Sequence, residues 1–280
     1  MPSNAPRLTK TQERDAARQK ALQLRAAQEK RARRSRIIGI SGLVVALAIL
    51  GVVVAMILSN AKPTAADLDP KTPLKGVTAP TTATDKGGIP VGTTGVAGTT
   101  SGTKAVTVTV YYDYLCPYCE KFETANGSVL DALTKSGDIT VEYHPISFLD
   151  SGSQGTKYST RTAAAAAYVA DADPSHFVAF HEALFKDQPA ENTSGKTDAE
   201  IAQIAVGAGV PQAVADKLAS GKFTTWVTAA TAQAQLDGVN ATPTVLINGK
   251  AATTTTGGTA APIDLYTAGP LEAAIRAAIG

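Results

Sequence analysis

The chain contains two cysteines, Cys116 and Cys119, within the sequence Cys-Pro-Tyr-Cys. An apolar, β-branched run at 105–112 precedes the pair, and a pattern with helical periodicity follows at 120–134. A strand, a C-x-x-C pair and a helix, in this order, are the layout of a thiol redox site. The residues therefore indicate thiol–disulfide exchange, with Cys116 as the attacking sulfur and Cys119 as the resolving sulfur.

The start of the predicted helix favours an acidic thiol at Cys116. If Cys116 is the N-cap residue, free backbone N–H groups and the positive end of the helix dipole face its sulfur. Such a position lowers a cysteine pKa from about 8.5 to roughly 3.5–7.5. Pro117 is then the first helical residue, where a missing backbone N–H costs nothing. We expect Cys119, one turn later, to be close enough for a disulfide.

A zinc site and a purely structural disulfide are the alternatives for this pair. Zinc needs about four ligands, and the chain has no second C-x-x-C. His176 and His181 are five positions apart, so they do not share a face of a helix. We expect no metal, and no cofactor beyond a redox-active disulfide between Cys116 and Cys119; the structural disulfide stays open.

Charge is unevenly distributed between the two ends of the chain. Residues 1–36 carry eleven Lys and Arg against three Asp and Glu, a net charge of +8, and the whole chain carries +2, which leaves −6 for the remainder. We interpret 1–36 as a basic cytoplasmic tail. Its charges would attract anionic lipid headgroups, and no aromatic or motif signal indicates binding of nucleic acid.

Residues 37–58 are 22 residues without a charged side chain. At 1.5 Å per residue they are long enough to cross a hydrocarbon core of about 30 Å. The preceding arginines predict a cytoplasmic N-terminus and an exported remainder. We expect an uncleaved, single-pass transmembrane helix in the cell membrane. A cleaved signal peptide is the alternative, but the basic lead and the apolar run exceed its usual dimensions.

Residues 59–103 are rich in Thr, Gly, Pro and Ala and contain almost no large apolar side chains. Such a segment cannot bury enough surface to offset its chain entropy, so we interpret it as a flexible, disordered linker. The predicted extracytoplasmic compartment permits disulfides.

The folded domain is predicted to span 104–280. Strands are expected at 105–112, 139–146 and 244–247, with a hairpin turn at Asn248-Gly249. A helical insert occupies about 159–237, and an amphipathic helix at 270–279 begins with Pro270. These elements predict an α/β fold.

The order of these elements resembles the thioredoxin fold and, more closely, the DsbA family of exported thiol–disulfide oxidoreductases. The matching stretches are Y-D-Y-L-C-P-Y-C at 112–119, F-V-A-F-H-E-A-L-F at 177–185 and G-V-N-A-T-P-T at 238–244. The resemblance covers about 104–280, and the paired motifs make it more specific than a lone C-x-x-C.

The resemblance implies further site residues. It implies a cis peptide bond before Pro243, opposite the cysteine pair, and a substrate-binding role for the Thr242 backbone. A trans proline that opens the strand is the alternative. Pro117 and Tyr118 lie between the cysteines, where DsbA oxidants commonly carry Pro-His, so Tyr118 leaves the direction of electron flow open. Asp113, three residues before Cys116, is expected either to exchange a proton with the pair or to cap the turn.

The resemblance also implies partners. These are exported polypeptides that bear thiols, and a membrane partner of the DsbB or VKOR kind that reoxidises the cysteine pair. The expected function is the introduction of disulfides into exported proteins. A reductant or isomerase of the same fold is one alternative. A non-catalytic, anchored binding or chaperone module with a structural disulfide is the other.

Overall fold

The structure is a computed structural model that describes residues 68–256 and 259–280. The predicted basic tail, the predicted transmembrane helix and the first part of the predicted linker lie outside these residues. Within the described ranges, no helix combines the length and apolar character needed to cross a membrane.

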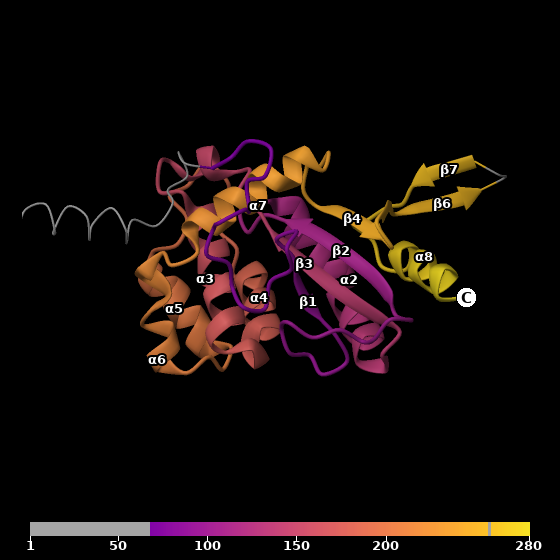
Figure 1. Cartoon of the computed structure of the whole chain (residues 1–280), viewed down its shortest axis with the longest axis horizontal. Helices are drawn as coiled ribbons and strands as arrows, with labels where there is room; N and C mark the ends of the chain where they lie inside the picture. Colours follow the sequence, from indigo (N-terminus) through magenta and orange to yellow (C-terminus); the bar gives the residue numbers. More distant parts are fainter. Residues whose placement is uncertain (1–67, 257–258) are drawn as a thin grey trace, which may run out of the picture. The chain divides into compact units, whose positions relative to one another are not determined.

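A five-stranded sheet with the order β1-β3-β2-β4-β5 forms the centre of the described domain (Figure 1). The strands β2 (Val106–Tyr112) and β3 (Ile139–Pro145) are parallel, and β1 (Ile89–Val91) pairs antiparallel with β3. On the other side β4 (Thr244–Ile247) runs antiparallel to β2, and β5 (Lys250–Ala251) pairs antiparallel with β4 at the edge of the sheet. Nearly every residue of β2 and β3 is buried, which explains their almost continuous apolar and β-branched sequence.

Helix α2 (Pro117–Ser136) connects β2 to β3 and begins three residues earlier than the periodicity predicts. Pro117 occupies its first turn, where the fixed φ of proline suits a helix start. The helix ends at Gly137, which has φ 88° and donates its N–H to the carbonyls of Leu133 and Thr134. A residue without a Cβ adopts this left-handed conformation at low cost, so the sequence sets both ends of α2.

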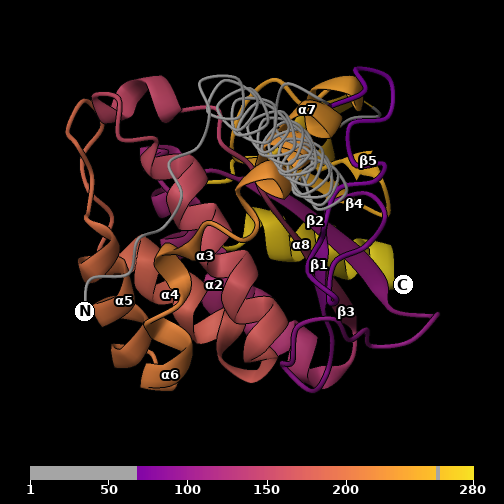
Figure 2. The same cartoon turned by 60° about the vertical axis from the view of Figure 1, so that its left-hand side comes forward.

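The predicted helical insert lies between β3 and β4. Helix α3 (Tyr158–Ala172) places its alanine run in the core, where the small side chains allow close packing against α4 (Phe177–Lys186) and α7 (Thr224–Leu236). Figure 2 shows α3 and α4 side by side. The elements of the insert are η2 (Asp150–Ser153), α3 (Tyr158–Ala172), η3 (Pro174–His176), α4 (Phe177–Lys186), α5 (Asp198–Gly207), α6 (Gln212–Ala215), η4 (Leu218–Ser220) and α7 (Thr224–Leu236).

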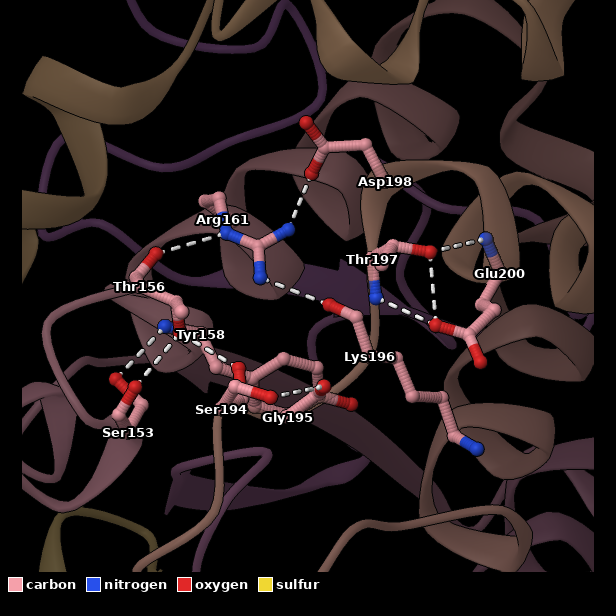
Figure 3. Close-up of polar contacts among 10 residues, drawn as sticks. All are labelled: Ser153, Thr156, Tyr158, Arg161, Ser194, Gly195, Lys196, Thr197, Asp198 and Glu200. Carbon is pink, nitrogen blue, oxygen red and sulfur yellow. Dashed lines mark hydrogen bonds and ion pairs between the residues drawn. The ribbon is translucent and has the colours of Figure 1, made fainter.

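The loop between α4 and α5 is fastened to the start of α3 (Figure 3). The Arg161 guanidinium donates to the carbonyls of Thr156 (2.9 Å) and Lys196 (2.8 Å), and it pairs with the carboxylate of Asp198. Gly195 has φ 67°, and a Cβ there would meet the ring of Tyr158 at 2.5 Å. Arginine hydrogen bonds and a close glycine contact therefore fix this part of the insert.

The C-terminal part contains a second, two-stranded sheet that was not predicted from the sequence. It consists of β6 (Thr253–Thr256) and β7 (Thr259–Pro262), and Figure 1 shows it at the end of the domain opposite α5 and α6. Before it, the predicted turn at Asn248-Gly249 has φ of 50° and 74°, as a two-residue hairpin turn requires. Helix α8 (Pro270–Ile279) ends the chain as predicted.

The prediction of a flexible linker over 59–103 is wrong for the residues that the structure describes. Ile89 is 0% exposed and Val91 is 2% exposed, and β1 adds an edge strand to the sheet beside β3. The Ser101 hydroxyl donates to the carbonyl of Ile139 at 2.6 Å. The folded domain therefore begins before the predicted boundary at 104.

The reason for this error is the way the segment is stabilised. Ile89 and Val91 are buried at alternate positions of a three-residue strand, and Leu74 and Val77 pack against the core from irregular positions. So short and scattered a pattern gives no periodicity. Polar contacts also hold the segment in place: the backbone N–H and the hydroxyl of Thr81 both lie 2.9 Å from the Asp171 carboxylate on α3.

The predicted α/β fold with a helical insertion is confirmed, and the folded domain begins earlier in the chain than predicted.

Candidate active site

The cysteine pair lies at the N-terminus of α2. Cys116 is the N-cap residue, with φ −77° and ψ 115°, and Pro117 follows in the first turn, as predicted. The backbone N–H of Cys116 donates to the Asp113 carbonyl, and the N–H of Cys119 donates to the Cys116 carbonyl, both at 3.0 Å. The two cysteines are free thiols in this structure. Cys116 is 4% exposed and Cys119 is 1% exposed, so Cys116 is the sulfur nearer to solvent.

The loop before β4 brings Thr242 to this sulfur. The peptide bond between Thr242 and Pro243 is cis, as the resemblance implies. The Cys116 thiol donates to the Thr242 carbonyl across 3.3 Å. The antiparallel register of β4 on β2 pairs Thr244 with Tyr111, and this pairing carries the preceding loop to the start of α2. The structure thus places Thr242 and the cis proline Pro243 beside Cys116.

The surroundings of Cys116 favour its thiolate. A hydrogen bond from the Cys119 thiol lowers the pKa of Cys116 to about 6; burial opposes this, and bonds from the Thr242 side chain and the backbone N–H groups of Cys119 and Tyr118 support it. The lowered pKa of Cys116 agrees with the sequence prediction. Its largest cause is different from the predicted one, because the Cys119 thiol lowers the pKa more than the backbone N–H groups of the helix start do.

The surroundings of Cys119 instead favour its protonated thiol. Burial raises the pKa of Cys119 far above its ordinary value, and the hydrogen bond that it gives to Cys116 acts in the same direction. A buried thiol that donates to a neighbouring thiolate keeps its proton at neutral pH. The pair therefore holds one negative charge at Cys116 and one proton at Cys119, which suits an attacking and a resolving sulfur.

Asp113 is a buried carboxyl group beside the pair. One carboxyl oxygen accepts the backbone N–H of Leu115, and the other accepts the N–H of Leu149, each at 2.9 Å. Burial raises the pKa of Asp113 to about 6, and the charge of Cys116 adds to this rise. Asp113 therefore caps the turn before Cys116, and it titrates in the pH range that proton exchange with the pair requires.

Two exposed tyrosines lie at the mouth of the site. Tyr118 is 53% exposed and Tyr266 is 44% exposed, and their ring centroids are 5.5 Å apart. The ammonium group of Lys121 lies 5.1 Å from the Tyr118 ring centroid. Tyr266, which precedes α8, was not predicted as a site residue from the sequence. The buried amide of Asn126 on α2 donates to the Leu265 carbonyl at 2.8 Å and holds this loop in place, a contact without a sequence signal.

Gln188, just after α4, is a second site residue that no pattern in the sequence predicts. Its side-chain Nε2 donates to the carbonyls of Tyr114 (2.9 Å) and Cys116 (3.1 Å). A glutamine after a helix end carries no recognisable motif, so only the folded chain reveals this contact with the cysteine turn.

A buried polar and aromatic cluster joins the insert to the active-site helix. His181 on α4 shares a hydrogen bond with the Tyr114 hydroxyl at 3.0 Å. Its other ring nitrogen lies 3.4 Å from the Glu123 carboxylate on α2. The ring of Tyr112 packs edge-on against His181 with a centroid separation of 4.7 Å. These contacts give α4 a fixed position beside α2.

Comparisons with known proteins agree with this geometry. A family model described as thioredoxin matches residues 93–260. The crystal structure of reduced DsbA from Mycobacterium tuberculosis is 34% identical, with a TM-score of 0.52, over 61% of this chain and 86% of that chain. The reduced form of the disulfide bond oxidoreductase DsbG from the same organism is 36% identical, with a TM-score of 0.50, over 59% of this chain and 79% of that chain.

A curated relative is the serine/threonine-protein kinase PknE of Mycobacterium tuberculosis, which is 33% identical over 153 residues. This match covers 52% of the present chain and 27% of the kinase, so the chain spans about a quarter of that relative's length. The family match covers more than half of the chain and begins before 104, in agreement with the corrected domain boundary. Together with the cysteine geometry, these matches establish that the chain belongs to the thioredoxin family and is a DsbA-like oxidoreductase.

Proposed function

We propose that this chain is a membrane-anchored, extracytoplasmic thiol–disulfide oxidoreductase that introduces disulfides into exported proteins. The observation that carries the proposal is the position of the Cys116 sulfur. It lies at the start of α2, 3.3 Å from the Thr242 carbonyl, with the protonated Cys119 thiol beside it. This arrangement presents one reactive sulfur next to the backbone of Thr242.

The charge distribution supports an oxidant over a reductant. A thiolate exists only in the reduced pair, so every group that stabilises the Cys116 thiolate stabilises the reduced enzyme. A pKa of about 6 at Cys116 therefore makes the oxidised pair a better electron acceptor, by the same reasoning that explains a strongly oxidising DsbA. Tyr118 replaces the histidine common in DsbA oxidants, but hydrogen bonds from Cys119 and Thr242 supply thiolate stabilisation without a cationic ring.

In the first step a substrate thiolate attacks the Cys116 sulfur of the oxidised pair. A disulfide forms between substrate and Cys116, and the bond between Cys116 and Cys119 breaks. Cys119 leaves with the electron pair and takes up a proton, because burial strongly disfavours its thiolate. Asp113 is the proposed donor of that proton, since its pKa of about 6 leaves a fraction of it protonated near neutral pH.

In the second step another thiolate of the substrate attacks the substrate sulfur of the mixed disulfide. Cys116 leaves as a thiolate, which its low pKa makes a good leaving group. The substrate has then lost two electrons and gained a disulfide, and the enzyme has gained those electrons as one thiolate and one thiol. A membrane oxidant, of the DsbB or VKOR kind that the family implies, would accept them and restore the disulfide.

The substrate is proposed to bind as an extended polypeptide beside Thr242. A mixed disulfide at Cys116 places the substrate backbone next to the loop that ends in Pro243, where it can pair with the backbone of Thr242. The exposed rings of Tyr118 and Tyr266 lie on the neighbouring surface. Aromatic rings provide contact area at a small cost in side-chain entropy, and they suit unfolded chains of varied sequence.

The proposed location depends on the sequence. The uncharged residues 37–58, after a cluster of arginines, support a membrane anchor with the catalytic domain outside the cytoplasm. Fusion of alkaline phosphatase after residue 280 would measure this topology in bacterial cells. Active phosphatase supports an exported domain, and inactive phosphatase from a stable fusion overturns that part of the proposal.

Oxidative refolding of a reduced, unfolded ribonuclease by the oxidised protein tests the activity. Wild type should restore ribonuclease activity, and Cys116→Ala should abolish this effect. Cys119→Ala should retain a substrate on Cys116 as a mixed disulfide visible by mass spectrometry. Full activity of Cys116→Ala would refute the mechanism.

Further measurements on the same proteins separate the alternatives. A reductant would reduce insulin faster than it oxidises ribonuclease, and its potential would lie near the thioredoxin value of about −270 mV instead of the DsbA value of about −120 mV. A binding module with a structural disulfide would resist dithiothreitol and would not form the Cys119→Ala mixed disulfide.

A further inference from the structure

The side chain of Gln188 connects the helical insert to the turn that carries Cys116. Helix α4 ends at Lys186, and Gln188 stands two residues later. Its Nε2 lies 2.9 Å from the Tyr114 carbonyl oxygen and 3.1 Å from the Cys116 carbonyl oxygen. One amide group therefore donates hydrogen bonds to the backbone carbonyls on both sides of Leu115, just before the helix begins.

The Tyr114 and Cys116 carbonyls differ in the other hydrogen bonds that they accept. The Cys116 carbonyl already accepts the backbone N–H groups of Cys119 (3.0 Å) and Glu120 (3.3 Å), as the first turn of α2 requires. The Tyr114 carbonyl accepts no other hydrogen bond among the residues that the structure describes. Gln188 thus satisfies a carbonyl that the local backbone leaves unpaired, and it ties that carbonyl to the N-cap residue.

Gln188 is itself held in place by the insert. Its backbone N–H donates to the Phe185 carbonyl at 3.2 Å. Phe185 is buried, and its ring lies 5.0 Å from the ring of Tyr114. His181, one turn earlier, binds the Tyr114 hydroxyl. The amide is therefore presented by a packed helix end, and its position follows that of α4.

We propose that Gln188 is a positioning residue that holds the turn from Tyr114 to Cys116, so that the Cys116 sulfur stays in register with Cys119 and Thr242. Through this contact the helical insert controls the redox balance of the pair. The inference rests on the proposed function. Hydrogen bonds to the thiolate depend steeply on distance and angle, so a looser turn weakens them and favours the thiol.

Three variants of the full chain test this proposal. Gln188→Met keeps the length and removes both donors. Gln188→Glu keeps the shape but places acceptors against two carbonyl oxygens, and a negative charge near the thiolate. Gln188→Asn keeps the amide on a shorter side chain. The readouts are the reduction potential against glutathione and the thiolate absorbance at 240 nm as a function of pH.

We expect Gln188→Met to lower the equilibrium constant for oxidation of glutathione about threefold and to raise the thiol pKa. Gln188→Glu should lower this constant about tenfold, which for a two-electron couple is about 30 mV. Gln188→Asn should lie between wild type and Gln188→Met. Gln233→Met is the matched control, because its amide binds Asp237 on the exposed side of α7, and it should retain the wild-type potential.

Variants with lower melting temperatures but wild-type potentials and titrations would show that Gln188 only stabilises the insert, and the proposal would be wrong. Equal changes in Gln188→Met and Gln233→Met would also overturn it. These outcomes are distinct from a failure of the proposed function, which Cys116→Ala reveals independently.

Discussion

The sulfur of Cys116 and the carbonyl oxygen of Thr242 lie 3.3 Å apart, although 126 positions separate the two residues in the chain. The Thr242 side chain also supports the Cys116 thiolate. One residue of the loop before β4 therefore offers its backbone at the reactive sulfur and adjusts the acidity of that sulfur.

Replacing Thr242 by valine tests the second of these roles. Valine keeps the β-branched shape and the backbone but removes the hydroxyl group. A hydrogen bond to a charged group contributes about 1.5–3 kcal/mol, so the pKa of Cys116 should rise by roughly one to two units. Absorbance at 240 nm, recorded against pH, measures this change. Thr228→Val, which loses a hydroxyl within α7, is the control, and equal titrations of both variants would contradict the assignment.

Alkylation of the reduced protein should report the unequal acidity of the two cysteines. With a Cys116 pKa of about 6, the thiolate fraction and the iodoacetamide rate should fall roughly tenfold from pH 7 to pH 5. Mass spectrometry should find a single modified residue, Cys116, because Cys119 is buried and keeps its proton. Equal labelling of both cysteines in the native protein would refute this division of roles.

Asp113→Asn should change how stability depends on pH. The pKa of Asp113 is raised from 3.8 to about 6, so the folded state binds a proton that the unfolded state has lost. Stability from this proton is present below about pH 4 and is lost as the pH rises through about 6. The difference in unfolding free energy between wild type and variant should therefore fall by on the order of 3 kcal/mol over this window.

Urea denaturation of the oxidised proteins at pH 4, 5, 6 and 7 measures that difference. The disulfide removes the charge of Cys116, which is a minor cause of the raised Asp113 pKa, and leaves burial as the main cause. Asparagine can replace only one of the two carboxylate acceptor sites for Leu115 and Leu149, so a constant offset is also expected. Curves that stay parallel across this range would show that Asp113 does not titrate there.

Tyr266→Ser should weaken the reaction with polypeptides more than the reaction with small thiols. The exposed Tyr266 ring lies next to Tyr118, and its loss removes contact area for a bound chain. We expect kcat/KM for a cysteine-containing peptide to fall about threefold to tenfold through KM, in line with about 1 kcal/mol for one aromatic contact. The rate with glutathione should not change. Leu236→Ser, at an exposed position on α7, is the control.

Ile89→Ala tests whether the segment before 104 belongs to the folded domain. Ile89 is fully buried in β1, and such a truncation costs about 2–5 kcal/mol. Ile279→Ala, at an exposed position of α8, should cost less than about 1 kcal/mol. Urea denaturation compares the two. Equal stability of both variants would restore the interpretation of this segment as a flexible linker.

Several features follow from the sequence because their causes are local. Pro117 can begin a helix but cannot continue one, and Gly137 tolerates the left-handed conformation that ends it. Together they place Cys116 at the N-cap of α2. The turn at Asn248-Gly249 follows in the same way from residues that accept positive φ. The cysteine pair, its helix and the hairpin after Pro243 were therefore predictable.

Other features depend on which distant segments meet. Thr242 reaches Cys116 through the register of β4 on β2, Gln188 reaches it through the docking of α4, and Tyr266 reaches Tyr118 through the amide of Asn126. The acidity of Cys116 owes most to its contact with Cys119, which depends on how the helix start is buried. Backbone preferences act over a few residues, whereas these contacts arise from packing between elements far apart in the chain, and so only the tertiary structure decided them.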